Sequence, residues 1–252
     1  MRKFNKDDEF IAYGLKTDVW RNVMRRFRAR IKALSLEDRL DLADKLFRMR
    51  IGELGHSAIY ALALSGQELG PQHIERLDRI AEEFTGWSHV DDFCITVAQP
   101  LLRAYRPETL TLLERWNRSP NRWKRRASVV AFVRKVGESG EFTEEALRLC
   151  ENLLGDREDL VQKGVGWTLK DVMRGDRERV LAYVKELRWR GGPATITLYA
   201  IRDLRGQSAK KCWVCAATGT GVPHGRSPVT TFRIRESALC RVNQIKPQAH
   251  FF

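Results

Sequence analysis

The sequence is organised around one stretch near its middle, which reads Gly86-Trp87-Ser88-His89-Val90-Asp91-Asp92-Phe93-Cys94. Read as a helix, it has an apolar face, with spacings of three and four residues, formed by Val90, Phe93, Val97 and Leu101. Trp87 and Asp91 lie one helical turn apart at the border of that face. Two interpretations stay open. Either Trp87 is a core residue and Asp91 a first-turn carboxylate facing the positive helix end, or the pair shapes a pocket for a positively charged group.

Almost every other segment up to Leu204 has helical periodicity, and no strand pattern competes with it. The expected helices are paired, joined by short turns, and recur roughly every 35 to 45 residues. This pattern predicts an all-α fold, an α-solenoid or superhelix of HEAT-like (armadillo-type) helical repeats. A globular all-α domain is the alternative. In a solenoid, the helices on one side line a concave surface that suits an elongated partner such as a duplex.

Three local expectations concern helix faces and helix ends. Ser35, followed by Asp38 three residues later, predicts a capped helix start. Residues 123–136 have the pattern of one helix, with an apolar side formed by Val129, Phe132, Val133 and Val136. Residues 17–34 have an apolar stripe of residues four apart, formed by Val19, Val23, Phe27 and Ile31.

Charge is the strongest compositional signal. The 252 residues carry a net charge of +13, and the sequence pI is about 9.8. Such a balance favours a polyanionic partner, most often nucleic acid, although a basic protein without such a partner is the alternative. The sequence contains no run of 18 apolar residues, so it predicts no membrane-spanning helix. The N-terminus lacks the apolar core of a signal peptide. Five cysteines, an odd count, suggest reduced thiols. We therefore expect a cytoplasmic, nucleoid-associated protein.

A second amphipathic helix is expected over residues 159–173. Its apolar face carries Val161, Val165, Leu169 and Val172, and its cationic face carries Lys163, Trp167, Lys170 and Arg174. Trp167 either packs against a neighbouring repeat or faces a ligand. Gly164 and Gly166 cost helix stability, roughly 1 kcal/mol each against alanine, which suggests a close approach to the backbone there.

A third stretch, Arg122-Trp123-Lys124-Arg125-Arg126-Ala127, begins a helix with clustered positive charge. Arg122 and Arg126 lie one turn apart, where they add to the positive end of the helix. This arrangement favours an anion such as phosphate. A solvated basic face is the alternative.

The sequence changes character after residue 205. Residues 206–252 are rich in Gly, Ser, Thr and Pro and lack helical periodicity. Cys212 and Cys215 form one CxxC, with His224 and Cys240 further on, but a structural zinc site needs four suitably spaced ligands. We therefore expect a repeat domain over residues 1–205, a poorly ordered tail over 206–252, and no metal.

Together the three stretches resemble the DNA alkylation repair enzymes built of HEAT-like repeats, the AlkD-like DNA glycosylase family. The motifs that carry the resemblance are Trp87-x-x-x-Asp91, Trp123-x-x-Arg126-Ala127 and Gln162-Lys163-Gly164-Val165-Gly166-Trp167-x-Leu169-Lys170. The resemblance implies a cofactor-independent monomer that acts on duplex DNA containing alkylated bases, in base excision repair. It assigns catalysis to Asp91, with Trp87 and Trp167 beside it, and phosphate binding to Arg126. Arg122, Lys163 and Lys170 are further candidates for phosphate contacts.

The implied reaction fits these residue types. A purine alkylated at N3 or N7 is already a cation, so it leaves without a general acid, and one carboxylate suffices where ordinary glycosidases use two. Asp91 would stabilise the developing sugar cation, and the tryptophans would face the cationic nucleotide. The competing hypothesis is a non-catalytic HEAT-repeat protein that recognises DNA of unusual shape.

Overall fold

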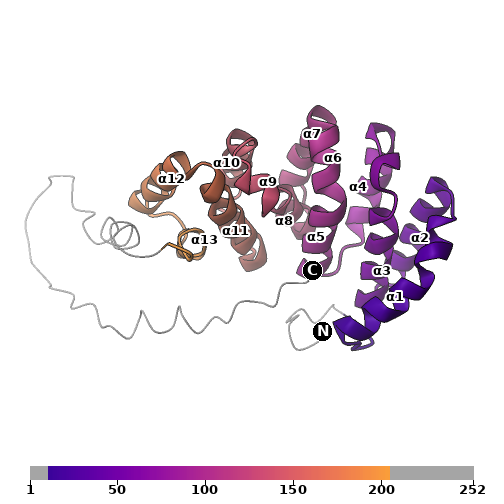
Figure 1. Ribbon diagram of the computed structural model, residues 1–252. Coiled ribbons are helices and arrows are strands. Elements are labelled where there is room, and N and C mark those ends of the chain that lie inside the picture. Colours follow the sequence, from indigo (N-terminus) through magenta and orange to yellow (C-terminus); the bar gives the residue numbers. More distant parts are fainter. Residues whose placement is uncertain (1–10, 205–252) are drawn as a thin grey trace, which may run out of the picture. The chain divides into compact units, whose positions relative to one another are not determined.

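The structure is a computed structural model that describes residues 11–204 (Figure 1). The expected tail and its CxxC lie outside the described residues. The helices are α1 (Thr17–Lys32), α2 (Leu36–Arg48), α3 (Gly52–Ala63), α4 (Ile74–Glu82), α5 (Trp87–Phe93), α6 (Gln99–Ala104), α7 (Arg106–Asn117), α8 (Arg122–Val130), α9 (Lys135–Glu138), α10 (Thr143–Asn152), α11 (Asp159–Gly175), α12 (Arg177–Trp189) and α13 (Ala194–Ala200). Short 3₁₀ turns cover Gly66–Glu68 and Pro71–His73, and a π-helix covers Cys94–Ala98.

Helix is the regular structure throughout the described part. Between residues 11 and 204, extended pairing is limited to a single bridge between Ile11 and Ile51. In the same range, no helix is long and apolar enough to cross a membrane. The predicted all-α helical repeat fold is confirmed.

The helices form two layers. In one layer α1 packs on α3, and α3, α5, α8, α11 and α13 then pack side by side in that order (Figure 1). In the other, α2 contacts α4, α4 contacts α7, and α7 contacts α10. Hydrogen bonds join successive repeats, such as Gln99 to Val133 and Thr168 to Val129, which are 34 and 39 positions apart. The stretches that carry the candidate site residues all belong to the first layer, in α5, α8 and α11.

A continuous apolar core runs between the layers from Leu40 to Ile201. Its largest fully buried side chains include Trp116, Phe93 and Phe132. Burial of such side chains stabilises the stack by roughly 1.5–3 kcal/mol each. Because the core is shared by successive repeats, it fixes how α5, α8 and α11 lie against one another.

Helix α1 packs through a different face from the one its sequence suggests. Val19, Val23 and Phe27 are 42%, 40% and 44% exposed. The buried side is formed by Met24 and Ile31, beside Trp20, whose indole N–H donates to Ser57 Oγ at 3.1 Å. The prediction that the stripe of residues four apart forms the packed face is therefore wrong, except for Ile31. Helix α1 packs mainly on α3, and that neighbour selects the buried side.

The cap at Ser35 is confirmed, because its hydroxyl accepts the N–H of Asp38 at 3.1 Å. The single helix expected over residues 123–136 is wrong. Helix α8 ends at Val130, and α9 begins only at Lys135. The break allows backbone to approach backbone: a Cβ on Gly137 would lie 2.6 Å from the carbonyl oxygen of Phe132 and 2.9 Å from the amide of Val172 in α11.

Candidate functional site

Asp91 lies in the second turn of α5, three residues before the π-helix Cys94–Ala98 begins. Trp87 is the first residue of that helix, and Gly86 precedes it in an extended conformation. Trp87 is half-buried and packs against the core. The side chain of Asp91 is 15% exposed. Single π-turns of this kind occur frequently at functional sites.

Asp91 is held by Arg126 of α8. Nη2 of the arginine lies 2.8 Å from Oδ1 and 3.1 Å from Oδ2, and Nε lies 3.1 Å from Oδ1. Nη1 donates to the carbonyl oxygen of Leu160 in α11 at 2.5 Å. The close approach expected at Gly164 is present, since a Cβ there would lie 3.3 Å from both Cγ and Nη1 of Arg126. These bonds connect three successive repeats through one guanidinium.

The environment of Asp91 perturbs its protonation. Burial raises the pKa of this carboxyl above its usual value, and the charge of Asp92 acts in the same direction. The positive charges of Arg126 and Arg134 act against this rise in the pKa. Asp91 is therefore a partly desolvated carboxylate whose ionised form depends on two arginines.

The neighbouring carboxylate has a different partner. Asp92 Oδ2 lies 2.9 Å from Nδ1 of His56 in α3, and His56 Nε2 lies 3.3 Å from the hydroxyl of Ser88. Asp91 contacts α8 and Asp92 contacts α3, so the two adjacent carboxylates belong to separate polar groups. Within residues 11–204, the polar contact to α11 comes from the Asp91 group, through Arg126 and Leu160.

Trp167 lies in α11, where it is half-buried and packs against the core. The guanidinium carbon of Arg134 lies 6.0 Å from the centre of its ring. Arg134 sits in the connection between α8 and α9, with φ of 55° and ψ of −134°. Sequence reasoning missed this arginine. The sequence signals it only in that a charged residue interrupts the apolar run of residues 129–136, three residues before Gly137.

Gly166, the second glycine of the α11 motif, allows α13 to approach. A Cβ there would lie 2.6 Å from Tyr199 Cβ and 3.0 Å from the carbonyl oxygen of Ile196. The two glycines therefore have different purposes. Gly164 makes room for the arginine that holds Asp91, and Gly166 makes room for the next helix of the layer.

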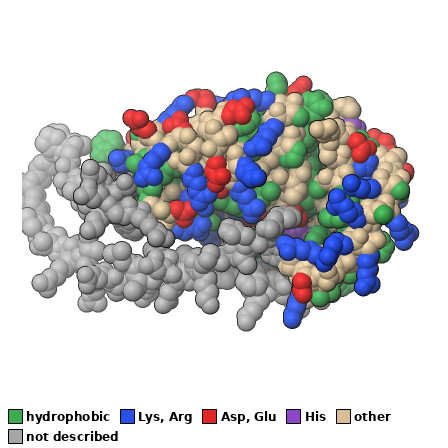
Figure 2. Space-filling view, in the orientation of Figure 1, with side chains coloured by type: hydrophobic (Ala, Val, Ile, Leu, Met, Phe, Trp, Pro, Cys, Tyr) green, Lys and Arg blue, Asp and Glu red, His purple; other side chains and the backbone are tan. Residues whose placement is uncertain are grey.

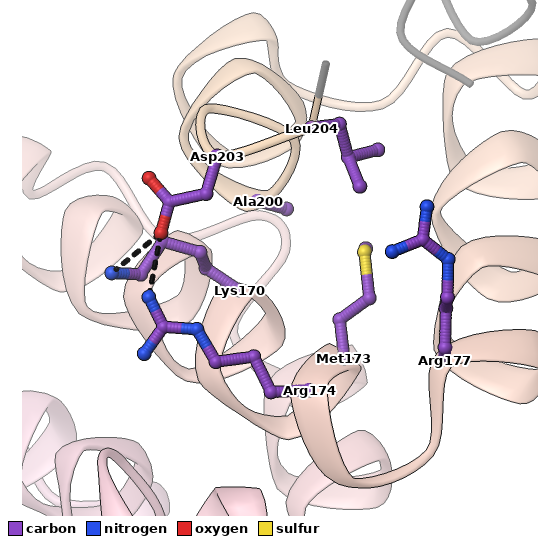
Figure 3. A pocket seen from close by; sticks show the side chains of 7 residues that line it. All are labelled: Lys170, Met173, Arg174, Arg177, Ala200, Asp203 and Leu204. Atoms are coloured by element: carbon purple, nitrogen blue, oxygen red, sulfur yellow. Dashed lines mark hydrogen bonds and ion pairs between the residues drawn. The ribbon is translucent and has the colours of Figure 1, made fainter. Parts of the chain in front are cut away.

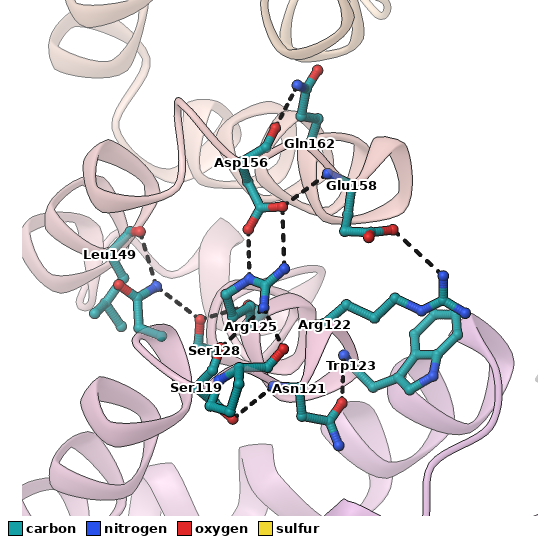
Figure 4. Close-up of polar contacts among 12 residues, drawn as sticks. Ser119, Asn121, Arg122, Trp123, Arg125, Ser128, Leu149, Asp156, Glu158 and Gln162 are labelled. Carbon is teal, nitrogen blue, oxygen red and sulfur yellow. Dashed lines mark hydrogen bonds and ion pairs between the residues drawn. The ribbon is translucent and has the colours of Figure 1, made fainter.

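The other basic candidates already have carboxylate partners. Arg122 lies 3.4 Å from Glu158 and stacks on the Trp123 ring at 4.6 Å (Figure 4). Lys163 pairs with Asp159 at 2.6 Å on an exposed face.

Lys170 lies 3.1 Å from Asp171 and 3.4 Å from Asp203. It helps to line a pocket of about 330 Å³ formed by residues of α11, the start of α12, the end of α13 and the segment after α13 (Figure 3). In the range 11–204, no hydrogen bond or ion pair joins Lys163 or Lys170 to Asp91. On the face drawn in Figure 2, basic and acidic side chains are interspersed.

The chain is similar to known proteins in sequence and in fold. A family model described as DNA alkylation repair enzyme matches residues 1–204. A structure titled as a predicted DNA alkylation repair enzyme from Enterococcus faecalis is similar, with a TM-score of 0.67 and 14% sequence identity, over 78% of this chain and 89% of that chain. Comparison with curated proteins gives no match. The family suggested by the three motifs is confirmed: the chain belongs to the DNA alkylation repair enzymes.

Proposed function

We propose that the protein is a DNA glycosylase that excises N3- or N7-alkylated purines from duplex DNA by hydrolysing the N-glycosidic bond. The observation that carries this proposal is the Asp91 carboxylate, which is largely buried and held by three contacts from Arg126. Membership of the DNA alkylation repair enzymes supports DNA as the partner.

The proposed reaction needs one anionic group at the sugar. An alkylated purine leaves as a neutral base, so the positive charge of the transition state develops on the sugar ring. A carboxylate aimed at that charge stabilises it more strongly in a desolvated site than in water. Arg126 would fix the direction of Asp91 in advance, which lowers the cost of reorganisation during the reaction. Trp87 and Trp167 would face the cationic nucleotide, each contributing about 0.5–2 kcal/mol.

The proposed phosphate contact of Arg126 is compatible with its internal bonds. A guanidinium has five N–H donors. Nε and Nη2 serve the contacts to Asp91, and one hydrogen of Nη1 serves the Leu160 carbonyl. The remaining hydrogen on Nη1 is the one that a phosphate oxygen would accept.

Arg122, Lys163 and Lys170 are proposed as further contacts to the DNA backbone. Arg122 and Lys163 would each exchange a partly exposed carboxylate for a phosphate. Lys170 would exchange the partly exposed Asp203 and keep its contact with the buried Asp171. Such surface ion pairs contribute little, about 0–1 kcal/mol, so the exchange has a low cost.

The decisive experiment is incubation with duplex DNA that contains 7-methylguanine, followed by measurement of released base. The Asp91→Asn variant keeps the size of the side chain and removes its charge. We expect its excision rate to fall roughly a hundred- to a thousandfold, the effect of losing about 2.7–4 kcal/mol of preorganised electrostatic stabilisation. DNA affinity should change little, because the charge acts mainly in the transition state.

Asp92→Asn is the matched control, because Asp92 pairs with His56 and not with Arg126. Undiminished excision by Asp91→Asn, with loss in Asp92→Asn, would reassign the catalytic carboxylate. DNA binding without release of any N3- or N7-alkylpurine by the parent protein would favour the non-catalytic DNA-binding alternative.

A further inference from the structure

Arg134 differs from the other arginines of the site in having no carboxylate partner. Arg122, Arg125 and Arg126 each lie within 3.4 Å of an Asp or Glu oxygen. In the part of the chain from 11 to 204, no carboxylate oxygen lies within 4.0 Å of the Arg134 guanidinium. Its charge is thus the least neutralised in the neighbourhood of Asp91.

The backbone of Arg134 is held in a strained conformation. A φ of 55° combined with a ψ of −134° lies outside the regions that side-chain-bearing residues prefer. The amide of Arg134 donates to Oδ2 of Asp171 at 2.8 Å. The side chain of Asp171 is 1% exposed, so this anchor is buried in α11. Strain of this kind persists only where the surroundings enforce it, and it occurs most often at functional sites.

The anchored conformation places Arg134 beside Trp167 and within electrostatic range of Asp91. Its guanidinium lies over the half-buried ring of Trp167 at 6.0 Å, and its charge acts on Asp91. A cation in this position repels a second cation, so it is poorly suited to contact an alkylated base directly. An anionic group that flanks the base is the complementary ligand.

We infer that Arg134 binds a backbone phosphodiester of the nucleic acid, beside the nucleotide that faces Trp167. The inference rests on the proposed function for its partner, duplex DNA. Asp171 acts as a positioning residue, because it holds the Arg134 backbone from the neighbouring repeat. The buried Arg126 orients Asp91, and Arg134, which has no carboxylate partner among residues 11–204, supplies the positive charge for the phosphate.

The test compares Arg134→Gly with a matched substitution at Arg50. Both arginines have a positive φ, 55° and 54°, but Arg50 lies before α3 and has Glu83 at 3.5 Å. Glycine relieves positive-φ strain at either position, so neither variant should lose thermal stability. Affinity for an undamaged duplex, measured by fluorescence anisotropy between about 50 and 200 mM salt, separates their effects on binding. Arg134→Lys keeps the charge.

We expect Arg134→Gly to lower affinity about tenfold at the lowest salt, the effect of losing one charge-assisted hydrogen bond. The slope of log affinity against log salt should decrease by about 0.9, the value for one phosphate contact. Arg134→Lys should keep most of the slope, and Arg50→Gly all of it.

An unchanged slope in Arg134→Gly would overturn the inference, as would an equal loss in Arg50→Gly, since net charge would then explain both. Reduced base release with unchanged duplex affinity would also overturn it, because Arg134 would then act on the chemistry. Failure of the proposed function looks different. A parent protein whose affinity is flat across this salt range does not bind DNA through phosphates at all.

Discussion

Replacing Arg126 with methionine tests how much the Asp91–Arg126 ion pair contributes to the stability of the fold. The substitution keeps an unbranched side chain in a site that is 5% exposed. It removes three contacts to Asp91 and the bond to the Leu160 carbonyl. Loss of one partner leaves a buried charge uncompensated, which costs roughly 3–5 kcal/mol. We therefore expect Arg126→Met to lower the free energy of unfolding by about that amount near pH 8.

The size of this loss should depend on pH, because Asp91 can become protonated. Arg126 is the strongest influence that lowers the pKa of Asp91, so its removal raises that pKa further. Protonation removes the uncompensated charge, and the destabilisation should therefore shrink as the pH falls. Urea unfolding, followed by far-ultraviolet circular dichroism near pH 8 and near pH 6, measures both quantities.

A double-mutant cycle supplies the control. When both charges are replaced by apolar groups of similar size, little of the penalty remains. Asp91→Leu combined with Arg126→Met should therefore be more stable than the sum of the single losses by at least about 1.5 kcal/mol. Single-variant losses below about 1 kcal/mol, or additivity within about 0.5 kcal/mol, would refute the description of a buried, coupled pair.

Three further predictions concern the glycines of α11, a buried histidine and the proposed catalytic carboxylate. Gly166→Ala should lower the free energy of unfolding by about 1–3 kcal/mol, because a Cβ 2.6 Å from α13 overpacks that interface. Gly164→Ala should cost less stability but reduce base release, since it presses on Arg126 at 3.3 Å. If Gly166→Ala and Gly164→Ala had equal effects on stability and on base release, the different functions assigned to the two glycines would be wrong. Burial lowers the pKa of His89 from 6.5 to about 3, so only the unfolded chain takes up a proton as the pH falls below about 6.5. The free energy of unfolding of the parent, relative to that of His89→Gln, should then fall by about 1.4 kcal/mol per pH unit down to about pH 3. If the two proteins lost stability equally with falling pH, the imidazole would not be desolvated. Burial raises the pKa of Asp91. If the ionised carboxylate is the catalyst, as proposed, base release should fall on the acid side at a higher pH than an ordinary aspartate gives. If the rate of base release stayed constant over this acidic pH range while the protein remained folded, Asp91 would be excluded as the ionised catalyst.

The fold was largely predictable because its determinants are local. Apolar spacing identified most helices, and the cap at Ser35 depends only on the next three residues. The packed face of α1 was not predictable in this way, because α3 selects it. The break after α8 depends on Asp171, which bonds to the Arg134 amide from 37 residues further along the chain.

The candidate site was predictable as a set of residues but not as a set of contacts. The three motifs pointed to Asp91 and Arg126 separately, and the arginine was expected to meet a phosphate. Their mutual contact joins residues 35 positions apart, and the stacking of successive repeats brings them together. Periodicity within one helix carries no information about that distance. The roles assigned to the site residues stay predictions.

The chain of bonds from Asp91 through Arg126 to Leu160 also has a mechanical consequence. A helical repeat array bends by small rotations where one repeat meets the next, and these bonds cross two such joints in succession. Bending that separates α5 from α8, or α8 from α11, must lengthen them. The joints at the site are therefore stiffer than joints held by apolar contacts alone. A force on the helices at either end of the array reaches the carboxylate through the same bonds that orient it.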